Sequence, residues 1–330
     1  MLISQGLALS DHTVKRLLSM NRRSLDQLAA KIYFYYSRFH ELASGVSGLV
    51  EIRSSLLSAQ QTAALRHDDD SLATLLNLLL RSYYAQNLYE QADKLIAKTK
   101  FPVNALNAQL ARWYYYVGRL RAIQLRYTES HNSMQQAIRR APNAKIAPGF
   151  YQTIHKLAIV VELLMGEIPE RSLFRHPVLK NSLVPYLPIA RAVRIGDLSG
   201  FTAALEAGTK GFKADGTYSL IVRLRHNVIK TALRTISLAY SKIPLSLIST
   251  KLGLDSEEEA EYVVAKAIRD GVVEAGLDHE SGVMMSSEVT DVYGTAEPMR
   301  AFDERIKFCL NLRNESVKVR FGSFLSLGSQ

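Results

Sequence analysis

Histidines, cysteines and glycine-rich turns are the residues through which this sequence could support catalysis or bind a metal. None of the eight histidines stands four residues from another, and the single cysteine has no histidine or second cysteine at ligand spacing. Neither a GxxxxGK[ST] loop nor a GxSxG turn occurs in the chain. His67 and the three aspartates after it precede an apolar helical run, which favours helix capping over a metal site. We therefore predict a non-enzyme without catalytic residues, metal or cofactor.

Basic residues in the middle of the chain indicate a surface that binds anions. The net charge of the chain is +10, and residues 101–200 contain 13 Lys/Arg against 5 Asp/Glu. Arg119, Arg121 and Arg126 follow the aromatic run Trp113–Tyr116. The planar guanidinium suits carboxylates and stacks on aromatic rings. We expect these three arginines to bind an acidic, extended protein segment. RNA is the competing ligand, and core packing is the competing explanation of the aromatic run.

Cys309 lies on the apolar side of a helix that the sequence predicts from about Pro298 to Arg320. The other members of that side are Phe302, Ile306 and Leu310. We expect a partner helix to cover this stripe as in a helical bundle. The alternative is that the helix folds back on its own chain. A packing role is favoured for Cys309 over a nucleophilic one.

Helical hairpins are predicted for most of the chain before these C-terminal features. Apolar residues from Ser24 to about Tyr240 recur at helical spacing, with paired helices at 104–124 and 128–139. The similar starts at Tyr89 and Tyr127 stand 38 residues apart, close to the spacing of tetratricopeptide-like hairpins. Three glycines are expected at helix ends, where positive φ is useful: Gly118, Gly166 and Gly196.

After Tyr240 the predicted order is strand, helix, turn, helix and hairpin, which is the order of a winged helix. The hairpin strands are expected at 272–275 and 283–286, around a loop rich in turn formers. We expect one of these strands to offer an open edge to a neighbouring protein, through Val283, Met284 and Met285. Residues 255–270 hold six acids against two bases, so we do not expect this module to read DNA.

Length and composition agree with an ordinary globular protein of about two domains. A lone cysteine excludes a disulfide scaffold, and no apolar run approaches the ~18 residues of a membrane span. We expect an intracellular, soluble, mainly α protein. It consists of a right-handed, TPR-like helical-hairpin solenoid, a winged-helix module with a small β-sheet, and a C-terminal helix. The expected boundaries are 1–66 for partly divergent N-terminal helices, 67–240 for the helical arm, 241–293 for the winged helix and 294–330 for the C-terminal helix and tail.

Five longer strings resemble the PCI-domain family of proteasome-lid, signalosome and translation-initiation scaffold subunits, with proteasome-lid members the nearest likeness. The strings are 75–81, 154–169, 214–218, 223–231 and 264–272, and the likeness runs from about Lys31 to Phe321. The resemblance implies a non-catalytic scaffold in ubiquitin-dependent protein degradation, located in cytoplasm and nucleus. The implied partners are other PCI-domain lid subunits, the small acidic disordered lid subunit, and the proteasome base and core. A nucleic-acid-binding adaptor in mRNA export or transcription is the alternative; a membrane partner is not expected.

Overall fold

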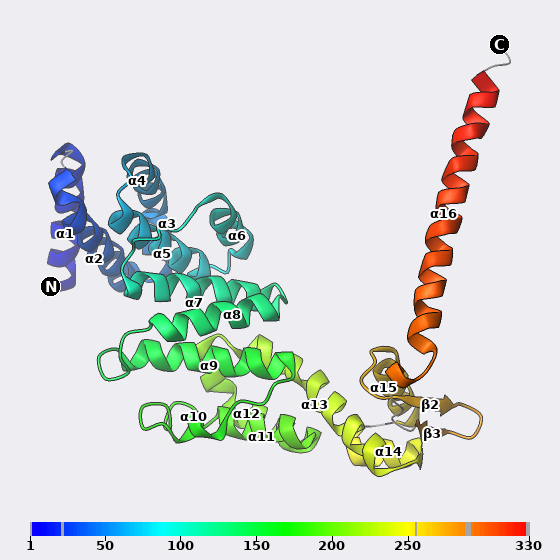
Figure 1. Cartoon of the computed structure of the whole chain (residues 1–330). Helices are drawn as coiled ribbons and strands as arrows, with labels where there is room; N and C mark the ends of the chain where they lie inside the picture. Colours follow the sequence, from blue (N-terminus) through cyan, green and yellow to red (C-terminus); the bar gives the residue numbers. More distant parts are fainter. Residues whose placement is uncertain (1, 21–22, 255, 288–291, 328–330) are drawn as a thin grey trace. The chain divides into compact units, whose positions relative to one another are not determined.

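The computed structural model describes residues 2–20, 23–254, 256–287 and 292–327, which form sixteen α-helices and one three-stranded sheet. The chain divides into two compact units, each described separately below. The first comprises 1–235 with 251–253, and the second comprises 236–250 with 254–330. Figure 1 gives the order of the elements along the chain.

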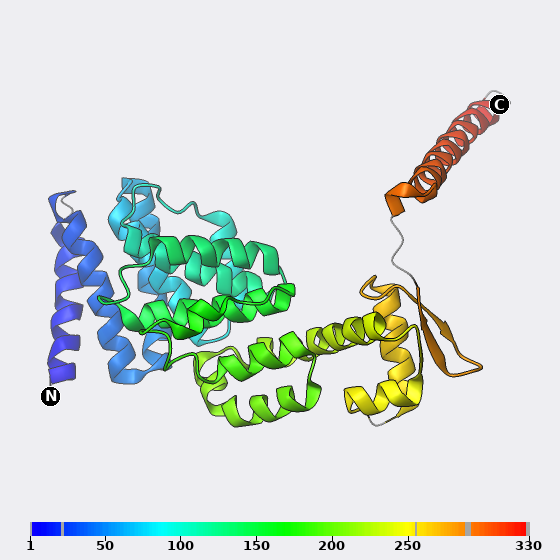
Figure 2. The ribbon, with the colours of Figure 1, turned by 60° about the horizontal axis from the view of Figure 1, so that its bottom comes forward.

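The first unit is a stack of helices, as predicted from the apolar spacing. Its helices are α1 (Leu2–Met20), α2 (Asp26–Ser44), α3 (Val46–Glu51), α4 (Arg53–Arg66), α5 (Asp69–Ala85), α6 (Tyr89–Lys98), α7 (Asn107–Ile123), α8 (Tyr127–Arg140), α9 (Pro148–Met165), α10 (Arg171–Arg175), α11 (Tyr186–Ile195), α12 (Leu198–Asp215) and most of α13 (Tyr218–Ala239). Neighbouring helices pack in sequence order, with α7 against α8 and α8 against α9 (Figure 2). The stacked hairpins confirm the TPR-like expectation.

Helix α5 shows how local sequence starts an element that packing then buries. Asp68 caps the helix, because its carboxylate accepts a hydrogen bond from the Ser71 amide at 3.1 Å. Asp69 and Asp70 occupy the first turn, where negative charge suits the positive end of the helix dipole. Most of the following side chains, from Leu75 to Leu80, are buried between α2, α4 and α7. The capping prediction for this acidic run is confirmed.

Gly118 lies inside α7 and not at a helix end, so that prediction was wrong. A Cβ at this position would collide with the end of the Met134 side chain on α8. The Ser130 hydroxyl donates a 2.7 Å hydrogen bond to the Gly118 carbonyl across the same crossing. Gly118 therefore allows two helices to approach closely. Gly166 and Gly196 do end α9 and α11, with φ of 91° and 82°, as predicted.

The second unit contains the predicted winged-helix order. It comprises the end of α13, β1 (Lys242–Pro244), most of α14 (Leu245–Leu252), α15 (Glu257–Arg269), β2 (Ala275–Asp278), β3 (Val283–Ser286) and α16 (Glu297–Leu327). The sheet is antiparallel in the order β1-β3-β2. Ser256 caps α15 by accepting a hydrogen bond from the Glu259 amide at 3.1 Å. The core of the second unit includes Ile243, Val264 and Met284.

The first hairpin strand lies three residues later than the predicted 272–275. Helix α15 ends in a turn, where Gly271 has a φ of 67° and the Val272 amide donates to the Ala267 carbonyl at 3.0 Å. Val273 is buried and belongs to this turn. The strand therefore begins only at Ala275 and continues through Asp278, a residue expected in the loop.

Candidate interaction surfaces

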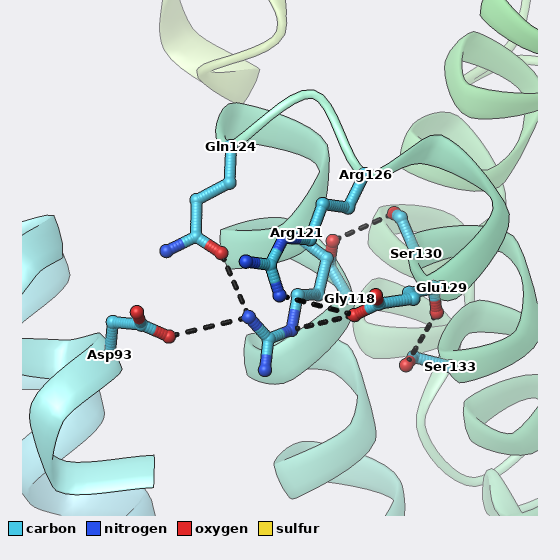
Figure 3. A network of polar contacts seen from close by, with 8 residues as sticks. All are labelled: Asp93, Gly118, Arg121, Gln124, Arg126, Glu129, Ser130 and Ser133. Atoms are coloured by element: carbon cyan, nitrogen blue, oxygen red, sulfur yellow. Dashed lines mark hydrogen bonds and ion pairs between the residues drawn. The ribbon is translucent and has the colours of Figure 1, made fainter. Parts of the chain in front are cut away.

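Arg121 joins three helices of the first unit. Its guanidinium donates to Gln124 at 2.9 Å and lies 3.4 Å from the Asp93 carboxylate on α6 and 3.2 Å from the Glu129 carboxylate on α8 (Figure 3). The Arg121 side chain is only 20% exposed. Two carboxylates thus already neutralise this charge within the chain, so Arg121 contributes to the packing of the repeats.

Arg126 shares Glu129 with Arg121, whereas Arg119 lies elsewhere. The Arg126 guanidinium is 3.8 Å from Glu129 and its side chain is 55% exposed. Arg119 stands two residues before Arg121, and such positions lie about 200° apart around a helix. Its guanidinium lies over the Tyr84 ring, 5.2 Å from the centroid. The structure therefore brings together only Arg121 and Arg126, and partner binding by the three arginines stays a prediction.

Arg119 lines a cavity of about 820 Å³ within the first unit. Side chains of α2, α5 and α7 form most of the walls, and Leu49 of α3, the start of α9 and the turn before α9 complete them. Four arginines and one carboxylate carry the charge of the lining: Arg38, Arg81, Arg112, Arg119 and Glu41. Arg112 and Arg119 belong to the basic middle of the chain that the sequence indicates. Arg38, Glu41 and Arg81 carry no such signal, because the charged lining residues come from three helices that meet only in the folded chain.

Glu41 holds two of the cavity arginines in place. Its carboxylate accepts hydrogen bonds from Arg81 at 2.7 and 3.1 Å and from Arg38 at 3.0 Å. Burial would raise the pKa of Glu41, but the hydrogen bonds and charges of Arg81 and Arg38 outweigh it and hold the pKa below its usual value. Arg38 and Arg81 are thereby committed to an internal carboxylate, unlike the other two arginines of the cavity.

The aromatic run Trp113–Tyr116 in the middle of α7 belongs mainly to the core, which was the competing explanation of this run. Trp113 and Tyr115 are buried. The Trp113 ring stacks on Phe101 with centroids 4.7 Å apart, and Tyr116 stacks on Tyr84 at 5.5 Å. These rings are therefore occupied by neighbouring side chains and do not form a platform for bases.

Among the described residues, β1 and β2 form the edges of the sheet, so the expectation of an edge at Val283–Ser286 was wrong, whereas the alternative, the earlier hairpin strand, does lie at an edge. Strand β3 lies between the other two, and both of its sides are paired. The Met284 side chain is 1% exposed and packs in the core, whereas Met285 is 40% exposed. Strand β3 comes last in the chain but lies in the middle of the sheet. The edge on the hairpin side is therefore formed by the earlier strand, β2. Strand addition at β2, and binding through Met285, remain predictions.

Helix α16 carries the predicted apolar stripe on its surface. Phe302, Ile306, Cys309 and Leu310 lie together along one face, beside Arg305 and Arg313. Every described side chain from 299 to 318 is exposed, with Phe302 at 64%. Cys309 is therefore exposed within this chain, contrary to the expected buried packing position. A partner helix over this stripe remains a prediction.

The N-terminal end of α15 is acidic, as the sequence indicates. Glu257, Glu258 and Glu259 occupy its first turn and are exposed. Glu261 follows and lies 2.6 Å from the His279 ring nitrogen. Asp255, counted among the acids of this segment, lies outside the described residues. Phosphates would be repelled from this end of the helix.

In the described ranges, no group of three or more histidine, cysteine, aspartate or glutamate side chains is arranged to hold a metal ion. Within the same ranges, no helix combines the length and apolarity required to cross a membrane.

Three family descriptions match the chain in order. "PSMD3-like, N-terminal TPR repeats" matches residues 2–190, and "PCI domain" matches 209–288. The family of the C-terminal segment of the proteasome regulatory subunit matches 291–322. The first of the three covers more than half of the chain. The repeat match lies within the first unit, the PCI match spans the end of the first unit and most of the second, and the C-terminal match lies within the second unit.

Curated relatives resemble the chain over nearly its whole length. A probable 26S proteasome regulatory subunit rpn3 of Schizosaccharomyces pombe is 55% identical over 305 residues, or 92% of this chain and 61% of the relative. A probable 26S proteasome non-ATPase regulatory subunit 3 of Anopheles stephensi is 52% identical, over 94% of this chain and 61% of the relative. The protein of that name from Dictyostelium discoideum is 48% identical, over 91% and 59%. The chain spans about three fifths of the length of the curated relatives it matches, and it belongs to the family of 26S proteasome non-ATPase regulatory subunit 3.

Proposed function

We propose that this chain is a non-catalytic structural subunit of the lid of the 26S proteasome regulatory particle. In this role it supports ubiquitin-dependent protein degradation by assembling with other PCI-domain subunits, in cytoplasm and nucleus. The observation that carries the proposal is the ordered match of repeats, PCI domain and C-terminal segment to one family over residues 2–322.

Two surfaces of the second unit support assembly with other PCI-domain subunits. Strand β2 has an edge that no described strand covers, and such an edge is a template for strand addition. Helix α16 exposes Phe302, Ile306 and Leu310 on one face. A stripe of this kind is suited to a helical bundle. Contact with the proteasome base and core would follow from incorporation into the whole particle.

The small acidic subunit of the lid is the proposed partner of the basic arm. Arg119 and Arg126 are the members of the predicted trio that support this, since neither is enclosed by carboxylates as Arg121 is. Helical solenoids bind extended peptides in their grooves, and disordered acidic chains can order on such a surface.

Purification of the tagged full chain from its native cells tests the proposal. We expect lid, base and core subunits to be recovered together at constant ratios, along with ATP-dependent degradation of a ubiquitinated substrate. The tagged double variant Phe302→Ala with Ile306→Ala provides the comparison, and it should recover fewer subunits. Recovery of messenger ribonucleoproteins that nuclease disperses, without proteasome subunits, would support the nucleic-acid adaptor instead. The acidic first turn of α15 does not favour that alternative.

A further inference from the structure

The cavity of the first unit contains more positive charge than its own residues neutralise. Its lining holds four arginines against one carboxylate, which leaves a net charge of +3. Glu41 accepts hydrogen bonds from Arg38 and Arg81, so these two guanidinium groups are paired. Arg112 and Arg119 form no ion pair with a carboxylate among the described residues. Most of the excess charge of the cavity therefore lies on α7.

Arg112 and Arg119 lie on the same face of α7, and an aromatic ring holds each of them. Seven residues make almost two full helical turns, so the two positions face the same way, about 10.5 Å apart along the axis. The Arg112 guanidinium lies 5.6 Å from the centroid of the Phe34 ring, and the Arg119 guanidinium lies 5.2 Å from that of Tyr84. A ring against the face of a guanidinium leaves the N–H groups at its edge as donors. The cavity thus offers two oriented anion-binding groups.

Several neutral side chains of the lining are bonded within the chain. The Asn77 amide donates to the Gln109 side-chain oxygen at 2.9 Å, and the Gln109 amide donates to the Thr74 hydroxyl at 3.0 Å. The Tyr84 hydroxyl donates to the Tyr116 carbonyl at 2.7 Å. The hydrogen-bonding capacity that remains for a ligand consists mainly of arginine donors. A matching ligand therefore presents anionic acceptor oxygens and few donors of its own.

We infer that this cavity binds a compact polyphosphate, either an inorganic chain or a small phosphorylated ring. Phosphate oxygens are acceptors, and a guanidinium fork pairs with them through two parallel hydrogen bonds. Several linked phosphates bridge Arg112 and Arg119, whereas a single phosphate or carboxylate engages one of them. The cavity volume of about 820 Å³ lies in the range of small-molecule sites.

An acidic peptide matches this lining less well than a polyphosphate does. Each peptide residue that enters the cavity brings a backbone N–H group, which needs an acceptor when it is buried. Glu41, the carboxylate of the lining, is already held by Arg38 and Arg81. A nucleobase is also disfavoured, because arginines cover the Phe34 and Tyr84 rings on which it would stack.

This inference goes beyond the proposed scaffold role, because it concerns a small-molecule ligand of the first unit alone. Isothermal titration calorimetry of the full chain compares inorganic tripolyphosphate, inositol hexakisphosphate and orthophosphate at about 0.15 M ionic strength, where distant charges are screened. We expect at least one polyphosphate to bind at least about tenfold more tightly than orthophosphate, because linked phosphates engage both arginines. The tighter of the two polyphosphates distinguishes a chain from a ring as the preferred form.

Variants locate the anion in the cavity. Arg112→Gln and Arg119→Gln should each weaken polyphosphate binding at least about fivefold, because each removes one of the two bridged groups. Arg112→Lys keeps the charge and loses the planar fork, so it should also weaken binding, and it serves where the glutamine variant lowers the melting temperature. Arg175→Gln removes the same charge from α10, outside the cavity, and should leave the affinity unchanged.

The inference would be overturned if orthophosphate and both polyphosphates bound equally, or if neither polyphosphate bound. An affinity that persists in both glutamine variants would place the anion elsewhere on the basic surface. Full affinity in Arg112→Lys would show that charge alone attracts the anion, without a built site. An octapeptide of aspartate that binds as tightly as the polyphosphates would identify an acidic protein segment as the occupant instead.

Discussion

At the residue scale, Arg121 and Arg126 differ in what they contact although both carry the same charge. Arg121 is 20% exposed and reaches Asp93, Gln124 and Glu129, whereas Arg126 is 55% exposed and reaches Glu129 alone at 3.8 Å. We expect Arg121→Ala to lower the free energy of unfolding by about 1–2 kcal/mol, because it leaves polar partners on two helices unpaired. Arg126→Ala should change it by less than about 0.5 kcal/mol. Urea denaturation of the full chain measures both, and equal losses would contradict the assignment.

The burial of His155 predicts that the stability of the folded chain depends on pH. Burial, and then the charge of the nearby His176, lower the pKa of His155 to about 4, and its Nε2 atom has no hydrogen-bond partner. Tyr151 lies against both rings. An unfolded histidine titrates near 6.5, so below that pH the unfolded state binds a proton that the folded state does not. The stabilisation is complete above about pH 6.5 and is lost as the pH falls toward 4.

We expect this residue to remove about 2 kcal/mol of folding free energy between about pH 7.5 and about pH 5. The variant His155→Leu should lack that part of the pH dependence. His12→Gln, at an exposed position of α1, is the matched control and should retain it. Denaturant titrations at several pH values provide the measurement. An unchanged pH dependence in His155→Leu would show that another group is responsible.

At the scale of the element, the hydrogen-bonding pattern of β2 shows which of its backbone groups are open for pairing with another strand. The Ser287 amide donates to the Glu274 carbonyl at 2.9 Å, which fixes the alternation of hydrogen-bonded pairs along β2 and β3. The Gly276 backbone thus faces β3, and the Leu277 backbone faces away from it. Leu277→Pro should weaken incorporation into the complex and leave the chain folded, because proline is tolerated on an edge.

Gly276→Pro is the contrasting change at the neighbouring position. It removes a donor inside the sheet, so it should lower the melting temperature of the purified chain, which Leu277→Pro should not. Co-purification measures incorporation, and thermal unfolding measures stability. Normal incorporation of Leu277→Pro would show that this edge is not used.

The apolar stripe of α16 predicts an interface on one face of this helix. Phe302 and Ile306 are 64% and 57% exposed on the stripe face, and each large apolar side chain contributes roughly 1.5–3 kcal/mol when buried. Phe302→Ala with Ile306→Ala should reduce incorporation and leave the melting temperature unchanged. Phe308→Ala with Leu312→Ala removes similar apolar area from other positions around the helix. Equal loss in both double variants would indicate a helix enclosed on all sides.

At the scale of the whole molecule, the net charge of +10 suggests a higher affinity for nucleic acid than we expect from where the charges lie. Three of the arginines are held by carboxylates within the chain: Glu41 binds Arg38 and Arg81, and Asp93 and Glu129 lie against Arg121. The winged helix in turn presents Glu257–Glu259 at the end that would enter a groove. We expect no submicromolar binding of duplex DNA or single-stranded RNA at physiological salt, measured by anisotropy of labelled oligonucleotides. Tight binding at that salt would revive the adaptor alternative.

Local sequence determined the elements and their order. Helix spacing, the Asp68 and Ser256 caps and the glycine ends of α9 and α11 depend on neighbours within about one turn, so they are readable without the fold. The winged-helix order and the family strings were also visible in the chain. The pattern was misleading at Gly118, where helix α8 packs too closely for a side chain, and at the start of β2, which the turn after α15 delays.

Tertiary structure alone decided which functional groups meet. Arg119 and Arg121 stand two residues apart in the sequence, yet one lines the cavity and the other joins three helices. Asn77 on α5 and Gln109 on α7 are separated in sequence by helix α6, yet hydrogen bonds of 2.9 and 3.0 Å join them. Sheet order placed β3 in the centre, and exposure of α16 left Cys309 on the surface. Local sequence fixes the face of a helix on which a side chain lies, but packing between distant helices decides what that face contacts, and no local pattern encodes this.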